Sequence, residues 1–152
     1  MKLSIASYNI IKKNKNNFLL ETKADILFSY GYTKEATKFY KKNLEKYPLN
    51  YYAQIRIFEN IEIKNLSNSD TEIIFQNNKD LLYKFYNNKN VLLKYFELAQ
   101  KLNKNEWLQF LNFFLSFNDM EKEVFDIELK NFKSTKDSDL LKLVNIIQNV
   151  NL

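Results

Sequence analysis

Carboxylates toward the C-terminus are the residues best suited to chemistry. Five of them fall close together in the sequence: Asp119, Glu121, Glu123, Asp126 and Glu128. Carboxylates gathered in this way can bind a hard cation or act as an acid–base pair. The spacing lacks the central glycine of a calcium loop, and Asp119 and Glu121 fall in the first turn of an expected helix, where acids complement the helix dipole. We therefore expect a solvated helix face here, with no metal site.

Other catalytic machinery is missing from the sequence. The chain has no histidine and no cysteine, which removes the commonest general base, the thiolate nucleophile and the usual zinc and iron ligands. Gly31 is the single glycine, so there is no glycine-rich phosphate loop and no nucleophile elbow. We expect a protein that is not an enzyme and that needs no cofactor.

Lysine dominates the positive charge. The formal net charge is +5, and Arg56 is the only arginine. Specific recognition of bases and phosphates relies on bidentate arginine. The abundance of lysine, with that of Asn, Ile, Phe and Tyr, is interpreted as the signature of an AT-rich genome. A basic arm at Lys12, Lys13 and Lys15 is an alternative to a solvated connector.

Composition favours an all-helical fold. The chain has 152 residues, 45% of them hydrophobic and 16% aromatic, so a packed core is expected. One glycine and one proline are too few for the turns of a strand-rich fold, whereas helical hairpins can turn on Asn, Asp and Ser.

The sequence also bears on location. No window approaches the roughly 20 apolar residues of a membrane span. Residues 1–11 lack the apolar core and the small-residue cleavage site of a signal peptide. We therefore expect a soluble, cytoplasmic protein.

Apolar residues at helical spacing predict about eight helices after a short leading segment. Their expected ranges are 17–30, 33–47, 50–66, 70–85, 91–102, 106–117, 119–132 and 140–150. Thr33 is expected to cap the second helix, and Ser69 or Asp70 the fourth. Asn77 and Asn78 interrupt the fourth. Paired in order within one domain, the helices give hairpins at approximately 17–48, 50–86, 90–117 and 119–151.

One hairpin has a recognisable pattern. The stretch Gly31 to Pro48 reads GYTKEATKFYKKNLEKYP, and small or aromatic residues stand at fixed places around it: Ala24, Gly31, Tyr32, Ala36, Tyr40 and Pro48. The segment 17–50 spans 34 residues and resembles a tetratricopeptide repeat, whose period is about 34. The resemblance implies antiparallel helical hairpins stacked as a short solenoid. A closed helical bundle is the alternative architecture.

The chain departs from this family's pattern in places. Leu20 stands where the family often has Trp, Lys23 where it prefers Leu, and Asn43 where a third small residue is usual. The segment 95–117 fits less well, with Trp107 in place of a small residue. The segment 50–86 fits only by its length and periodicity. The other hairpins are therefore expected to be degenerate repeats.

The resemblance implies a binding groove formed by the first helices of successive hairpins. The positions that correspond to groove residues are Phe18, Glu21, Asp25, Phe28, Tyr52, Ile55 and Glu59. The basic clamp with which some members bind a terminal carboxylate is not matched, because Glu21 and Asp25 occupy positions where Lys and Asn are needed. A helical or basic segment of another protein in a larger assembly is the expected partner. The alternative is a lysine-rich protein that binds nucleic acid through nonspecific phosphate contacts.

The sixth expected helix is apolar nearly all round. Its aromatic residues include Trp107, Phe110, Phe114 and Phe117. Such a helix is either buried centrally or presents an association face to a partner or to a second copy of the chain.

Overall fold

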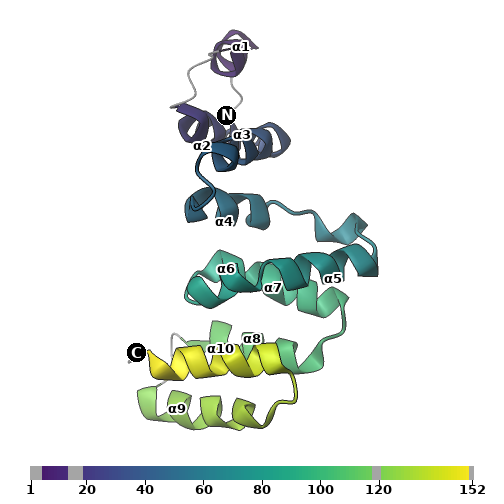
Figure 1. Ribbon diagram of the computed structural model, residues 1–152, viewed down its shortest axis with the longest axis vertical. Helices are drawn as coiled ribbons and strands as arrows, with labels where there is room; N and C mark the ends of the chain where they lie inside the picture. The colour runs from purple at the N-terminus through teal and green to yellow at the C-terminus, as the bar shows by residue number, and fades with distance from the viewer. Residues whose placement is uncertain (1–4, 14–18, 118–120, 151–152) are drawn as a thin grey trace. The chain divides into compact units, whose positions relative to one another are not determined.

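The computed structural model describes residues 5–13, 19–117 and 121–150 (Figure 1). Every regular element within these ranges is helical, and none of these residues lies in a strand. The all-helical expectation is therefore confirmed. The chain divides into two compact units, Met1–Ile61 and Glu62–Leu152, which are described separately. The single domain stays a prediction.

The first unit contains α1 (Ile5–Lys13), α2 (Leu20–Ser29), α3 (Thr33–Lys46) and α4 (Tyr51–Glu59). Its core is one apolar cluster in which Ala24 of α2, Ala36 of α3 and Ala53 of α4 are fully buried. Small side chains at these places allow the helix backbones to approach closely. Leu27 and Tyr40 complete the buried cluster.

A tight turn joins α2 to α3. Gly31 has a φ of 84°, which glycine adopts without the steric cost that a Cβ would add. The N–H of Tyr32 donates to the carbonyl of Leu27 at 2.9 Å, and the N–H of Gly31 donates to that of Phe28 at 2.9 Å. These bonds satisfy carbonyls that the end of α2 would otherwise leave unpaired. The helix therefore stops where the sequence predicts.

Several expected boundaries in the first unit are corrected. The leading segment contains a helix, α1, which packs on the core through Tyr8 and Ile11. Thr33 is the first residue of α3 and makes no side-chain cap, because its neighbour Tyr32 occupies the N-cap position. The third expected helix ends at Glu59 instead of continuing to residue 66. The Asn60 side chain donates to the carbonyl of Arg56 at 2.6 Å and so caps this end.

The second unit contains six helices among its described residues. They are α5 (Asn68–Asn77), α6 (Lys79–Lys84), α7 (Lys89–Lys101), α8 (Asn105–Leu115), α9 (Lys122–Asn131) and α10 (Ser138–Asn149). Short 3₁₀ turns lie at Ile63–Asn65 and Phe132–Ser134. In this unit α9 and α10 lie side by side, and α7 packs against α8 (Figure 1).

An aromatic core holds the second unit together. The rings of Phe75, Tyr95 and Trp107 are buried, and the Phe75 centroid lies 5.2 Å from that of Tyr95 and 5.1 Å from that of Trp107. The Tyr95 hydroxyl donates to the carbonyl of Phe75 at 3.0 Å, and the indole N–H of Trp107 donates to Asp137 at 2.8 Å. Each buried polar tip thus has a partner, as such aromatic residues require.

The turn between α7 and α8 repeats the geometry of the first hairpin with a different residue. Asn103 has a φ of 53°. The N–H of Lys104 donates to the carbonyl of Ala99 at 2.9 Å, as Tyr32 does to Leu27. Asparagine tolerates the left-handed region better than other residues with a Cβ. Two hairpins, one in each unit, therefore close in the same way.

Two boundaries in the second unit also differ from expectation. The fourth expected helix is two helices, α5 and α6, separated at Asn78, so its interruption is confirmed. Its cap is Ser67, whose hydroxyl accepts from the N–H of Asp70 at 3.0 Å. Neither Ser69 nor Asp70 is the N-cap, because the helix begins two residues before Asp70.

Candidate interaction surfaces

The expected groove residues lie on two helices of the first unit. Glu21, Asp25 and Phe28 are on α2, and Tyr52, Ile55 and Glu59 are on α4. We call these six residues, with Arg56, the α2/α4 face. Phe18, the seventh expected residue, lies outside the described residues.

Asp25 is the hydrogen-bonding centre of the α2/α4 face. Its Oδ1 accepts from the Tyr40 hydroxyl at 2.5 Å and from the Tyr52 hydroxyl at 2.8 Å. The three residues belong to three different helices, so one carboxylate oxygen joins α2, α3 and α4. Burial and the neighbouring carboxylate raise the pKa of Tyr40 well above its usual value, which keeps its hydroxyl protonated as a donor.

Arg56 connects the remaining aromatic and acidic members of the face. Its Nε donates to the Tyr52 hydroxyl at 3.1 Å, and its Nη1 lies 3.3 Å from Glu59 Oε2. The guanidinium carbon lies 4.8 Å from the centroid of the Phe28 ring and 5.2 Å from that of Tyr52. A guanidinium held against two rings in this way loses little freedom when it binds. The predicted residues Phe28, Tyr52 and Glu59 are therefore brought together by Arg56.

Glu21 lies at the end of the face where α4 begins. The Asn50 amide donates to Glu21 Oε2 at 2.5 Å and to Asn43 Oδ1 at 2.9 Å, while its own oxygen accepts from the N–H of Ala53 at 3.1 Å. Asn50 therefore caps α4 and ties it to α2 and α3. Asn43 replaces an expected small residue, and its buried amide has this partner.

Four residues of this network are not in the expected groove: Tyr40, Asn43, Asn50 and Arg56. Tyr40 matches the aromatic position of the family pattern, but its hydroxyl bond to Asp25 spans 15 residues and depends on the packed hairpin. Arg56 could have been singled out from the sequence, because it is the only arginine of the chain. Ile55 is half-buried on α4.

The aromatic residues of α8 do not form an exposed face. Trp107, Phe110 and Phe114 are buried, with exposed fractions of 1%, 0% and 8%. This corrects the association-face interpretation for these three, and a centrally buried helix describes them instead. Phe117 is half-buried and lines a hollow of about 200 Å³ together with Tyr86.

The expected acidic cluster lies on and just before α9. Glu121, Glu123, Asp126 and Glu128 are exposed, and Asp119 lies outside the described residues. In the part of the chain that the structure describes, no three His, Cys, Asp or Glu side chains gather as a metal site requires. Of the expected basic arm, Lys13 is exposed at the end of α1, whereas Lys15 and the side chain of Lys12 are not described.

A polar hollow of about 350 Å³ lies beside the end of α9, and its lining includes Glu106, Glu128, Ser134 and Thr135. The Ser134 hydroxyl donates to the carbonyl of Asn131 at 3.0 Å, and the Thr135 hydroxyl donates to Glu106. Both hydroxyl protons therefore have structural partners, at the end of α9 for Ser134 and on α8 for Thr135.

No protein-family model, curated protein or solved structure matches the chain. Among the described residues, no helix combines the length and the apolar character that crossing a membrane requires.

Proposed function

We propose that this chain is a non-catalytic protein-interaction module. In this proposal its hairpins form a short solenoid of the tetratricopeptide type, and the α2/α4 face holds a helix or an extended segment of another protein. The observation that carries the proposal is the joining of Asp25 on α2 to Tyr52 on α4 by a 2.8 Å hydrogen bond. This hydrogen bond joins two residues that are 27 positions apart in the sequence into one surface.

The rigidity of the α2/α4 face supports binding. Asp25 has two hydroxyl donors, and Arg56 is held by two hydrogen-bonding partners and two aromatic rings. Side chains already fixed in place lose little conformational entropy when a partner arrives. Tyrosine and arginine are also among the residues that contribute most to binding energy at protein interfaces.

Charge indicates the kind of segment that fits. The face carries three carboxylates, from Glu21, Asp25 and Glu59, and one guanidinium, from Arg56. Its net negative charge favours a segment with Lys or Arg side chains, and it disfavours an acidic tail. Apolar side chains of the partner would contact Phe28 and Ile55.

Affinity purification from the native source tests this proposal. The test variant Ile55→Lys with Glu59→Gln places a positive charge on the face, removes a negative one and leaves Asp25 and its donors intact. The matched control, Ile73→Lys with Glu62→Gln, makes the same chemical changes at exposed positions of the second unit.

The wild-type chain and the control are expected to retain the same proteins, and the test variant to lose them. Equal retention by all three chains, with unchanged helical content by circular dichroism, would argue against this face.

A further inference from the structure

The outward side of α3 is strongly basic. This helix has five lysines and two glutamates. Lys34, Lys38, Lys41 and Lys42 are exposed, while Ala36 and Tyr40 on the opposite side are buried. We call these four lysines the α3 basic face.

An apolar patch lies within the α3 basic face. A hollow of about 490 Å³ is lined by Glu35, Lys38, Phe39, Lys41, Lys42 and Glu45. Phe39 is half-buried, and the ammonium of Lys42 lies 5.9 Å from the centroid of its ring. The hollow therefore fits a side chain that is apolar and has carboxylates as neighbours.

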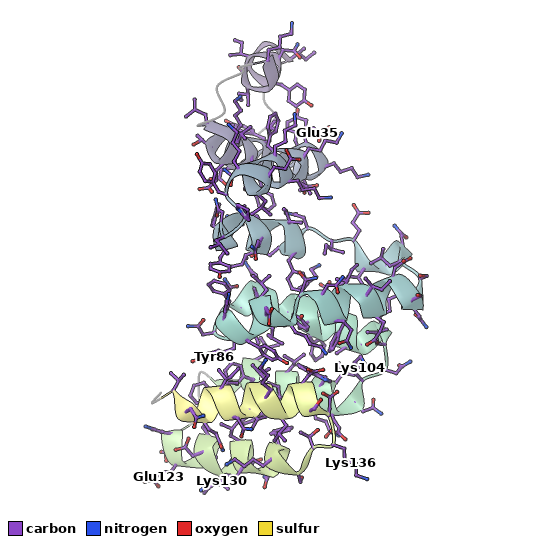
Figure 2. All side chains as sticks on the ribbon, viewed as in Figure 1. Glu35, Tyr86, Lys104, Glu123, Lys130 and Lys136 are labelled. Carbon is purple, nitrogen blue, oxygen red and sulfur yellow. The ribbon has the colours of Figure 1, made fainter. Side chains whose placement is uncertain are left out.

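The outward side of α9 carries three exposed carboxylates, from Glu123, Asp126 and Glu128, and two exposed lysines, Lys122 and Lys130. Phe125 and Leu129 are buried, so the other side of the helix faces solvent. Ile127 is 62% exposed and Val124 is 45% exposed. Figure 2 shows Glu123 on the side of α9 away from α10, and Asp126 and Glu128 are also exposed. We call Glu123, Val124, Asp126, Ile127 and Glu128 the α9 acidic face.

We propose that the α9 acidic face of one copy of this chain docks on the α3 basic face of a second copy. In this contact Ile127 lies over Phe39 in the hollow, and Glu123 and Asp126 approach Lys38 and Lys41. Charge complementarity favours this occupant, because the α3 basic face presents four lysines and the α9 acidic face presents three carboxylates in every copy of the chain.

Such a contact is heterologous, because it joins two different surfaces of the chain. Further copies can add wherever a face is left unoccupied. A contact between two single helices is small, which places it among weak and transient interfaces. We therefore expect reversible self-association that grows with protein concentration and weakens with salt.

Nucleic acid is less well matched to the α3 basic face. The phosphates of a duplex offer no apolar side chain to fill the hollow beside Phe39. Lysine also lacks the bidentate geometry with which arginine binds phosphate.

Sedimentation velocity of purified chains tests the proposal. The first variant, Lys38→Glu with Lys41→Glu, makes the basic face acidic. The second, Glu123→Lys with Asp126→Lys, makes the acidic face basic. Each alone is expected to associate at least about 10-fold more weakly than the wild type, because like charges then face each other. Mixed in equal amounts they are expected to form a 1:1 complex, since the first keeps the native acidic face and the second the native basic face.

Two further chains separate local contacts from net charge. A chain with all four substitutions has the native net charge and exchanged faces, and it is expected to self-associate again. The control Lys89→Glu with Lys136→Glu has the same net charge as the first variant but changes exposed lysines outside both faces, and it is expected to associate like the wild type.

Three results would overturn the proposal. One is a wild-type chain that stays monomeric up to about 1 mM in about 0.05 M NaCl, where surface charges are weakly screened. Another is a mixture of the two variants in which both remain monomers. The third is salt-sensitive binding of duplex DNA, abolished by Lys38→Glu with Lys41→Glu, in a chain that does not self-associate.

Discussion

The Tyr40 hydroxyl offers the sharpest test of how the α2/α4 face is held. Tyr40→Phe removes only this oxygen, and the ring stays in its fully buried site, so no large cavity forms. The lost bond is a 2.5 Å donation to the Asp25 carboxylate. Hydrogen bonds to charged groups contribute about 1.5–3 kcal/mol, so we expect a loss of about 2 kcal/mol in the free energy of unfolding.

Tyr52→Phe is the matched comparison. Its hydroxyl also donates to Asp25, at 2.8 Å, but Tyr52 is 39% exposed, so water can replace part of the lost bond. We expect a loss of about 1 kcal/mol or less. With both substitutions Asp25 loses both donors, and the combined loss should exceed the sum of the single losses by at least about 0.5 kcal/mol.

Urea denaturation followed by circular dichroism measures these changes. With a slope of about 1–3 kcal/mol per molar urea, the loss of 2 kcal/mol moves the midpoint for Tyr40→Phe by about 1 M. Losses below about 0.5 kcal/mol for both single variants, or strictly additive losses, would refute the claim that Asp25 holds the three helices together.

Three other predictions follow from the structure. Lys101→Met should lower the free energy of unfolding by about 1.5–3 kcal/mol in urea denaturation, because the ammonium donates to three carbonyls in the loop 63–66; an unchanged midpoint would contradict this role. Gly31→Ala should cost about 1–2 kcal/mol by the same assay, although a Cβ there would meet no atom within 4 Å, because the cost comes from its φ of 84°; a stabilised variant would be inconsistent with that φ. Asp137 is partly buried, but hydrogen bonds from the N–H of Leu140 and the indole N–H of Trp107 outweigh burial and lower its pKa. The stabilisation that this carboxylate contributes should be complete above the unfolded pKa of about 3.9 and should disappear as the pH falls through the folded pKa. A folded pKa at or above about 3.9 in an NMR titration would contradict the direction of this shift.

The first hairpin was predictable because its signals are local. Ala24, Gly31, Ala36 and Tyr40 stand at spacings that can be recognised in one short stretch, and each is buried or forms the turn as expected. The apolar pattern around Trp107 likewise included the correct interpretation, a buried central helix.

Other parts of the fold depended on contacts that periodicity does not report. Ile5 and Ile10 of α1 are exposed, while Tyr8 and Ile11 pack on the core, so the apolar residues of this short helix do not mark one buried side. The turn at Asn103 has a left-handed φ, but no glycine marks it in the sequence. Asparagine is common in loops of every kind, so its presence did not predict this conformation. The end of α4 was misplaced because apolar residues continue beyond it, to the buried Ile63 in a 3₁₀ turn.

The candidate site shows the same division. The resemblance to a tetratricopeptide repeat implied that Asp25 and Tyr52 share a groove, and the structure brings these two residues into hydrogen-bonding distance. Arg56 stands out in the sequence as the only arginine. The contacts of Tyr40 and Arg56 were not predictable, because a hydroxyl bond between helices and a guanidinium beside two rings arise only after packing.

Hydrogen–deuterium exchange on the chain with its captured partner shows which helices the partner covers. We expect the partner to slow exchange of backbone amides in α2 and α4, and we expect the effect to be lost with Ile55→Lys and Glu59→Gln. Slowed exchange confined to the second unit, with α2 and α4 unchanged, would contradict the claim that the α2/α4 face is the binding surface.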